Sequence, residues 1–87
     1  MNQAILFPDI QEWNAKLEVI KFPALQSGSL IDCTISLHRL SALSRNDEIG
    51  ENEVLNVFSE YRFDIEEIAE EMIEDEMFND LDQIEIS

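Results

Sequence analysis

The sequence predicts a small α+β domain: an antiparallel sheet of three or four strands with two or three helices packed on one face. Short β-rich segments that end at turn residues occupy residues 4–36, and apolar residues at helical spacing follow from residue 37. At 87 residues the chain has the length of one domain, so we expect a single domain over residues 1–87. The apolar content of 45% is sufficient for one core.

The predicted strands are residues 4–7, 16–22 and 30–36. The first two end at Pro8 and Pro23, and both prolines are expected at strand ends, where no ladder hydrogen bond is lost. The third alternates between apolar and polar side chains, which is typical of a strand with one buried face. The Gln-Ser-Gly-Ser sequence at 26–29 predicts a hairpin turn.

Helical spacing begins after Ser36, a predicted N-cap, and places three leucines on one side: Leu37, Leu40 and Leu43. Residues 44–53 are polar and contain Gly50, so we expect mainly a loop. The helical period resumes over residues 54–61. Four large aromatic residues are expected in the core or at its rim: Trp13, Phe22, Phe58 and Phe63.

The strongest helical signal covers residues 64–76. Asp64 with Glu67 three residues later resembles a capping box. The expected core side of this helix is Ile65, Ile68, Ala69, Met72 and Ile73. We expect it to pack against the sheet face formed by Ile31, Cys33 and Ile35. Residues 83–87 alternate in polarity and predict a short final strand.

The net charge of −15 belongs entirely to the second half of the chain. Residues 1–46 carry four carboxylates and four cations, whereas residues 47–87 carry sixteen carboxylates and a single cation, Arg62. Such a surface repels nucleic-acid phosphates and anionic lipid headgroups. We therefore expect no direct binding to nucleic acid or membranes, and a basic protein as the compatible partner.

No motif predicts a catalytic, metal or cofactor site. Cys33 and His38 are the only thiol and imidazole; the cysteine shares the apolar face of its strand, so we interpret it as a core residue. Asp80-x-Asp82 resembles the start of a calcium loop but lacks the required glycine. The apolar run near Met1 is too short for a signal peptide or membrane anchor, and a single cysteine fits a reducing compartment, so we expect a cytoplasmic protein.

Several short motifs recur in the order and spacing of a known family. They are Phe7-Pro8-Asp9, Glu12-Trp13, Phe22-Pro23-Ala24, Cys33-x-Ile35-Ser36, Phe58, Arg62-x-Asp64, Glu66-Glu67 and Ala69-Glu70. With these residues the chain resembles the YrdB-like family of short bacterial proteins of unknown function (DUF1488). The resemblance implies a small bacterial cytoplasmic protein and brings no established activity.

The candidate binding surface is a row of glutamates on the last helix together with the isolated cation: Glu66, Glu67, Glu70, Glu71, Glu74 and Arg62. Carboxylates four residues apart repel one another on a helix, which costs about 0.2–0.5 kcal/mol per pair. The leading hypothesis is a non-catalytic protein-interaction module whose acidic helix meets a basic partner. The alternatives are weak divalent-cation binding, an enzyme that uses paired carboxylates, and a glutamate row that only keeps the protein soluble.

Overall fold

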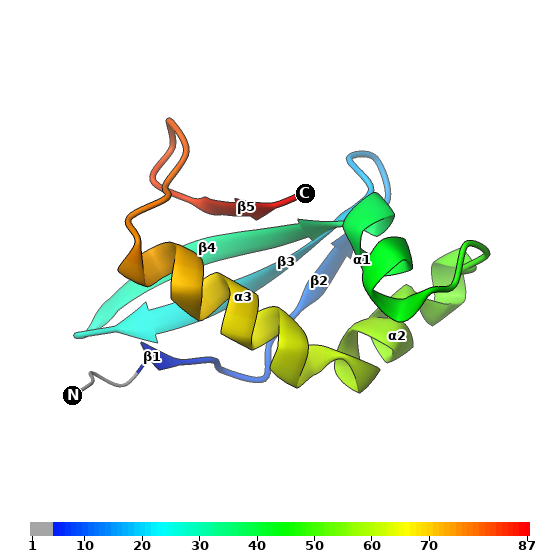
Figure 1. The fold of residues 1–87 in the computed structure, drawn as a ribbon, viewed down its shortest axis with the longest axis horizontal. Coiled ribbons are helices and arrows are strands. Elements are labelled where there is room, and N and C mark those ends of the chain that lie inside the picture. Colours follow the sequence, from blue (N-terminus) through cyan, green and yellow to red (C-terminus); the bar gives the residue numbers. More distant parts are fainter. Residues whose placement is uncertain (1–4) are drawn as a thin grey trace.

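The computed structural model describes residues 5–87 and has the α+β architecture (Figure 1). The elements follow one another as β1 (Ile5–Leu6), β2 (Glu12–Asn14), β3 (Val19–Gln26), β4 (Ser29–Ser36), α1 (Leu37–Ser44), the short 3-10 helix η1 (Glu51–Glu53), α2 (Val54–Glu60), α3 (Arg62–Glu74) and β5 (Ile84–Ile86). The predicted strand–helix–strand order is confirmed. No helix of the described residues is long and apolar enough to span a membrane.

The β3–β4 hairpin forms the centre of the sheet, and its eight residue pairs run from Val19 with Ser36 to Gln26 with Ser29. Its two-residue turn has positive φ angles at both central positions, 52° at Ser27 and 81° at Gly28. This conformation matches the twist of the strands it joins, and glycine adopts it without strain. The predicted hairpin turn at residues 26–29 is confirmed.

The predicted position of Pro23 at a strand end is wrong. β3 begins at Val19 and continues through Pro23, which lies opposite Asp32 of β4. On the other edge of β3, β2 pairs with residues 19–21 and β1 with residues 25–26. Pro23 therefore lies in the gap between these two short strands, where a missing N–H leaves no hydrogen bond unmade.

The sheet has five strands rather than the predicted three or four, with the order β1-β3-β4-β5 and with β2 beside β1 on the outer edge of β3. β2 was not predicted, because three residues are too few to show a period. β5 confirms the predicted final strand, but it pairs with β4 in parallel. A parallel neighbour requires a long crossover, and the three helices between β4 and β5 provide it.

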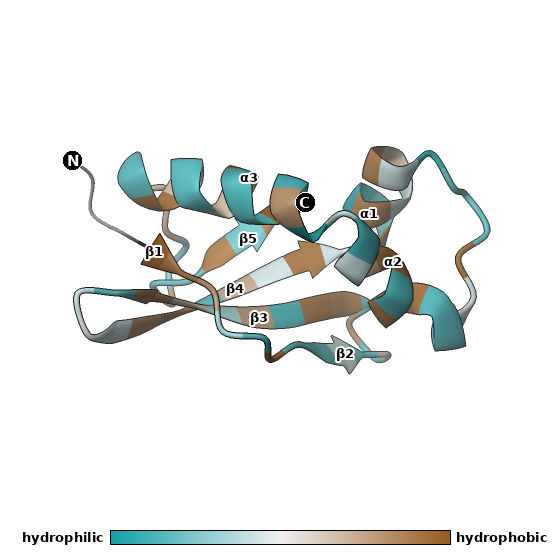
Figure 2. Ribbon diagram, turned by 90° about the horizontal axis from the view of Figure 1, so that it is seen from below, coloured by the Kyte–Doolittle hydropathy of each residue, from teal (hydrophilic) through white to brown (hydrophobic). Residues whose placement is uncertain are grey.

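The core lies between the sheet and the helices. Figure 2 shows α3 along the upper side of the sheet and no helix beneath the strands. Ser36 caps α1 as predicted, since its Oγ accepts a hydrogen bond from the Arg39 amide at 3.0 Å. The buried apolar residues include Ile20, Phe22, Cys33, Ile35, Leu40, Phe58, Ile65, Ala69, Ile73, Ile84 and Ile86. Ile68 and Met72 pack at the edge of this core.

The predicted capping box at Asp64 and Glu67 is wrong, because α3 begins two residues earlier, at Arg62. Only Tyr61 separates α2 from α3, and the Ile65 amide donates to the Tyr61 carbonyl at 3.0 Å. Helix α3 continues almost directly from α2, so few of its first amides need a side-chain cap. Asp64 instead lies in the first turn, where a negative charge is favourable.

Candidate functional site

Helix α3 has one apolar side and one acidic side. Ile65, Ala69 and Ile73 are fully buried at a spacing of four residues and fix the orientation of the helix. The opposite side exposes three carboxylates of the predicted row, Glu67, Glu71 and Glu74, while Glu66 and Glu70 are half-buried at its border. We call Glu66, Glu67, Glu70, Glu71 and Glu74 the glutamate row.

Four members of the glutamate row form no ion pair with any cation of residues 5–87. The ion pairs among residues 5–87 join Lys21 to Asp32 and join Arg62 to both Asp9 and Glu66. Glu66 is thus the one member whose charge is compensated within the described part of the chain. The outer surface of α3 consequently carries negative charge that nothing in residues 5–87 neutralises.

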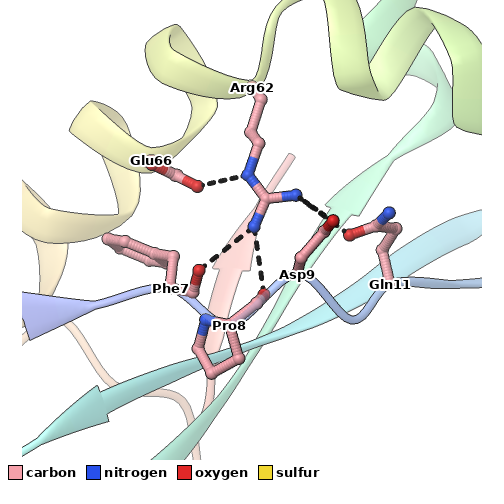
Figure 3. A network of polar contacts seen from close by, with 6 residues as sticks. All are labelled: Phe7, Pro8, Asp9, Gln11, Arg62 and Glu66. Carbon is pink, nitrogen blue, oxygen red and sulfur yellow. Dashed lines mark hydrogen bonds and ion pairs between the residues drawn. The ribbon is translucent and has the colours of Figure 1, made fainter.

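Arg62 is placed at the end of α3 nearest the segment that follows β1 (Figure 3). Its Nε donates to Glu66 at 2.6 Å, and its two terminal nitrogens donate to four groups of that segment at 2.9–3.1 Å: the backbone carbonyls of Phe7 and Pro8 and the side chains of Asp9 and Gln11. The sequence predicts Asp64, Glu66 or a loop carbonyl as the partner of this single cation, in a contact that joins the last helices. Glu66 and the carbonyls of Phe7 and Pro8 are its partners, and Asp64 is not. These bonds join α3 to the segment after β1 rather than to another helix.

A shallow hollow of about 390 Å³ lies between β1 and α3. Phe7 and Ile5 form its apolar wall, and the other wall is the start of α3 with Phe63, Asp64, Glu66, Glu67 and Glu70. Phe63 is 84% exposed, so its predicted place in the core or at the rim of the core is wrong. Two residues correspond to about 200° around a helix, which puts Phe63 nearly opposite the buried Ile65. That spacing would have predicted its exposure from the sequence.

Comparison with known proteins identifies the family. Residues 5–86 match the family described as "Protein of unknown function (DUF1488)". The chain belongs to the DUF1488 family. It is 38% identical over 80 residues to the uncharacterized protein YrdB of Escherichia coli (strain K12) and 36% identical over 80 residues to that of Shigella flexneri, in each case over 92% of both chains.

A crystal structure of a DUF1488 protein of unknown function from Shewanella loihica PV-4 has the same fold. The TM-score is 0.91 at 38% sequence identity, over 99% of this chain and 94% of that one. These comparisons confirm the family resemblance and the α+β fold class. They assign no activity, partner or site to the DUF1488 family, so a functional argument depends on the side chains themselves.

The thiol and the imidazole of this DUF1488 protein lie on different elements. Cys33 is fully buried in β4, where its Sγ donates to the Ile31 carbonyl at 3.7 Å, whereas His38 is exposed on α1. Burial, assisted by the negative charge of Asp32, raises the pKa of the Cys33 thiol from 9.0 to about 12. A thiol that remains protonated is a poor nucleophile, so Cys33 is a core residue.

The described part of this DUF1488 protein also offers no metal centre or buried polar site. Residues 5–87 contain no group of three or more His, Cys, Asp or Glu side chains placed to hold a metal ion. All of the buried side chains in the same range are apolar. Paired carboxylates with the shielded setting that acid–base catalysis needs are therefore not found among them.

Proposed function

We propose that this protein is a non-catalytic protein-interaction module that binds a basic protein surface through the glutamate row of α3. The observation that carries the proposal is the uncompensated charge of that row, since only Glu66 has a cationic partner among residues 5–87. The buried side of α3 holds the helix against the core, so its glutamates extend from a fixed backbone. A row of this kind costs stability, at about 0.2–0.5 kcal/mol for each like-charge pair four residues apart.

The geometry suggests which part of a basic side chain each group contacts. Glu67, Glu71 and Glu74 project from successive turns, so lysines or arginines spaced along a partner helix or strand can each meet a carboxylate. Phe63 lies at the same end as Glu67 and Glu70, beside the hollow. Its exposed ring can hold the methylene stem or the guanidinium of an arginine.

Arg62 supports this surface from within rather than by direct contact. Its five hydrogen bonds to the chain occupy the guanidinium, and one of them fixes the Glu66 carboxylate at the border of the row. We therefore assign it a positioning role in binding. The negative charge of the glutamate row favours a basic protein over nucleic acid, because it repels phosphates. We place the interaction in the cytoplasm, a reducing compartment in which the free thiol of Cys33 is stable.

The test compares two triple variants with the same change in net charge. One neutralises the exposed row with Glu67→Gln, Glu71→Gln and Glu74→Gln; the control neutralises carboxylates exposed elsewhere with Asp47→Asn, Glu48→Gln and Asp80→Asn. Each immobilised protein is used for capture from lysate at low salt, followed by elution with a salt step. We expect a specific basic protein on the wild type and the control, with at least tenfold weaker binding to the row variant once that protein is purified.

Two results would overturn the proposal. Equal binding by the row variant and its control would show that only the overall charge matters. A calorimetric titration in which calcium or magnesium binds with micromolar affinity, and in which the row variant loses that binding, would favour the cation-binding alternative instead.

A further inference from the structure

The sheet has a second face, opposite the helices, which no helix of residues 5–87 covers. In β3 the buried residues Ile20, Phe22 and Ala24 alternate with Val19, Lys21, Pro23 and Leu25, which therefore point to the other side. Figure 2 shows that no helix lies beneath the strands on that side. Residues paired directly across the strands share a face, so the pairing register defines which side chains this open face carries.

One end of the open face carries three leucines in a row. Leu25 of β3 pairs with Leu6 of β1 on one side and with Leu30 of β4 on the other. Directly paired side chains in an antiparallel sheet are about 5 Å apart, so the three form a continuous apolar strip. Leu6 is 58% exposed and Leu30 67% exposed, so both side chains present apolar surface to solvent on either side of Leu25. We call Leu6, Leu25 and Leu30 the leucine row.

The surroundings of the leucine row are free of charge. Residues 5–8 and 22–31 contain no ionisable side chain, in a chain whose net charge is −15. The charges on this face lie farther along the strands. Asp32 and Lys21 are 3.8 Å apart, and the register places the carboxylates of Glu12 and Glu85 beyond them, next to Lys21 and Thr34. The leucine row is thus a surface where two strongly acidic molecules can meet without bringing carboxylates together.

From these observations we propose that the leucine row is a self-association surface, occupied by the leucine row of a second copy of this chain. An uncharged apolar strip is complementary to itself across a twofold axis, which is the geometry of most homodimers. It offers no charge by which a partner of opposite sign could be selected. The glutamate row lies on α3, across the sheet from the leucine row, so two copies joined through their open faces keep their acidic helices on the outside, where their repulsion is weakest.

Self-association and the binding of a basic partner should respond to salt in opposite directions. Sodium chloride screens the repulsion between two acidic chains, so self-association should strengthen as salt rises. Binding of a basic protein to the glutamate row should weaken under the same change. The two proposals therefore stand or fall separately, and the row variant with Glu67, Glu71 and Glu74 neutralised should still self-associate.

The experiment is sedimentation equilibrium of the full chain from about 10 μM to 1 mM, the range expected for a small interface, at low and high sodium chloride. Leu30→Lys tests the leucine row, and Leu17→Lys is the matched control because Leu17 is also 67% exposed but lies in the turn between β2 and β3, away from the row. Leu6→Ser is a second test without added charge, and circular dichroism verifies that each variant is folded.

We expect the wild type and Leu17→Lys to pass from the monomer mass of 10.1 kDa to a dimer at high concentration. Leu30→Lys and Leu6→Ser should raise the dissociation constant at least tenfold. A wild type that stays monomeric over the whole range at both salt concentrations would overturn the proposal. So would equal effects of Leu30→Lys and Leu17→Lys, or dimers that dissociate as salt rises.

Discussion

Arg62 donates a hydrogen bond from Nη2 to the backbone carbonyl of Phe7 at 3.1 Å, across a separation of 55 residues. The same guanidinium donates from Nε to Glu66 of its own helix. The only cation of the acidic half thus ties the start of α3 to the segment that follows β1. Because its side chain is only 20% exposed, these bonds are partly shielded from water.

Arg62→Ala should lower the free energy of unfolding by about 1–3 kcal/mol, because it removes the donor to the half-buried Glu66 carboxylate and to the Phe7 carbonyl and leaves the Pro8 carbonyl with only the Ile10 amide. Urea denaturation followed by circular dichroism measures the change. Lys16→Ala makes the same change in net charge at an exposed side chain and should be nearly neutral. Equal effects of the two substitutions would mean that the Arg62 network contributes only its charge.

Ile65→Ala should cost about 2–5 kcal/mol, the usual range for truncating a fully buried isoleucine. Ile68→Ala should cost less, because Ile68 only borders the core. Thermal melts of both variants give the comparison, with the exposed Glu67→Ala as the control. If Ile65→Ala and Glu67→Ala melted at the same temperature, the assigned orientation of α3 would be wrong.

Glu71→Gln should stabilise the protein by about 0.3–1 kcal/mol, because it relieves like-charge repulsion with Glu67 and Asp75, four residues away on either side. In a domain of this size that is a rise of a few degrees in melting temperature. Added sodium chloride should raise the melting temperature of the wild type and reduce the advantage of the variant. A variant that melts lower than the wild type at every salt concentration would show that Glu71 makes a favourable contact.

The Cys33 thiol should make stability fall with alkaline pH. Its pKa is raised in the folded state, from 9.0 to about 12, by burial and by the charge of Asp32. Above pH 9 the unfolded chain releases this proton while the folded chain keeps it, so the free energy of unfolding falls by about 1 kcal/mol per pH unit until the folded thiol also ionises. Below pH 9 the thiol is protonated in both states and has no effect.

Urea denaturation of the wild type and of Cys33→Ala at several alkaline pH values isolates this contribution. The substitution lowers stability overall by leaving a small cavity, so the slopes with pH are compared rather than the absolute values. The wild type should show the steeper decline. Parallel slopes would mean that Cys33 ionises as readily in the folded protein as in the unfolded chain.

Local sequence signals predicted the elements that depend on local chemistry. The alternation of residues 30–36, the Ser27-Gly28 turn and the Ser36 cap each involve neighbours in the chain, and each is found as predicted. The buried side of α3 was likewise visible in the spacing of Ile65, Ala69 and Ile73. The uncompensated glutamates could be counted directly from the sequence.

The features that were missed depend on which segments become neighbours. Pro23 is tolerated inside β3 only because β1 and β2 stop on either side of it. The parallel pairing of β5 and the contacts of Arg62 with residues 7–11 join segments far apart in the chain, and no local periodicity reports such pairs. The leucine row is also a product of register, since Leu6, Leu25 and Leu30 meet only when three strands align.

The parallel pairing of β5 with β4 also sets the order in which the protein can fold during synthesis. The β3–β4 hairpin needs only residues 19–36 and can close as soon as they have left the ribosome. β5 cannot join until α1, α2 and α3 have been made and folded back across the sheet. Until then the edge of β4 at Cys33–Ile35 remains unpaired in every nascent chain. An open strand edge is a template for pairing with another chain, so the interval before residues 84–86 emerge is when this protein is most exposed to misassembly.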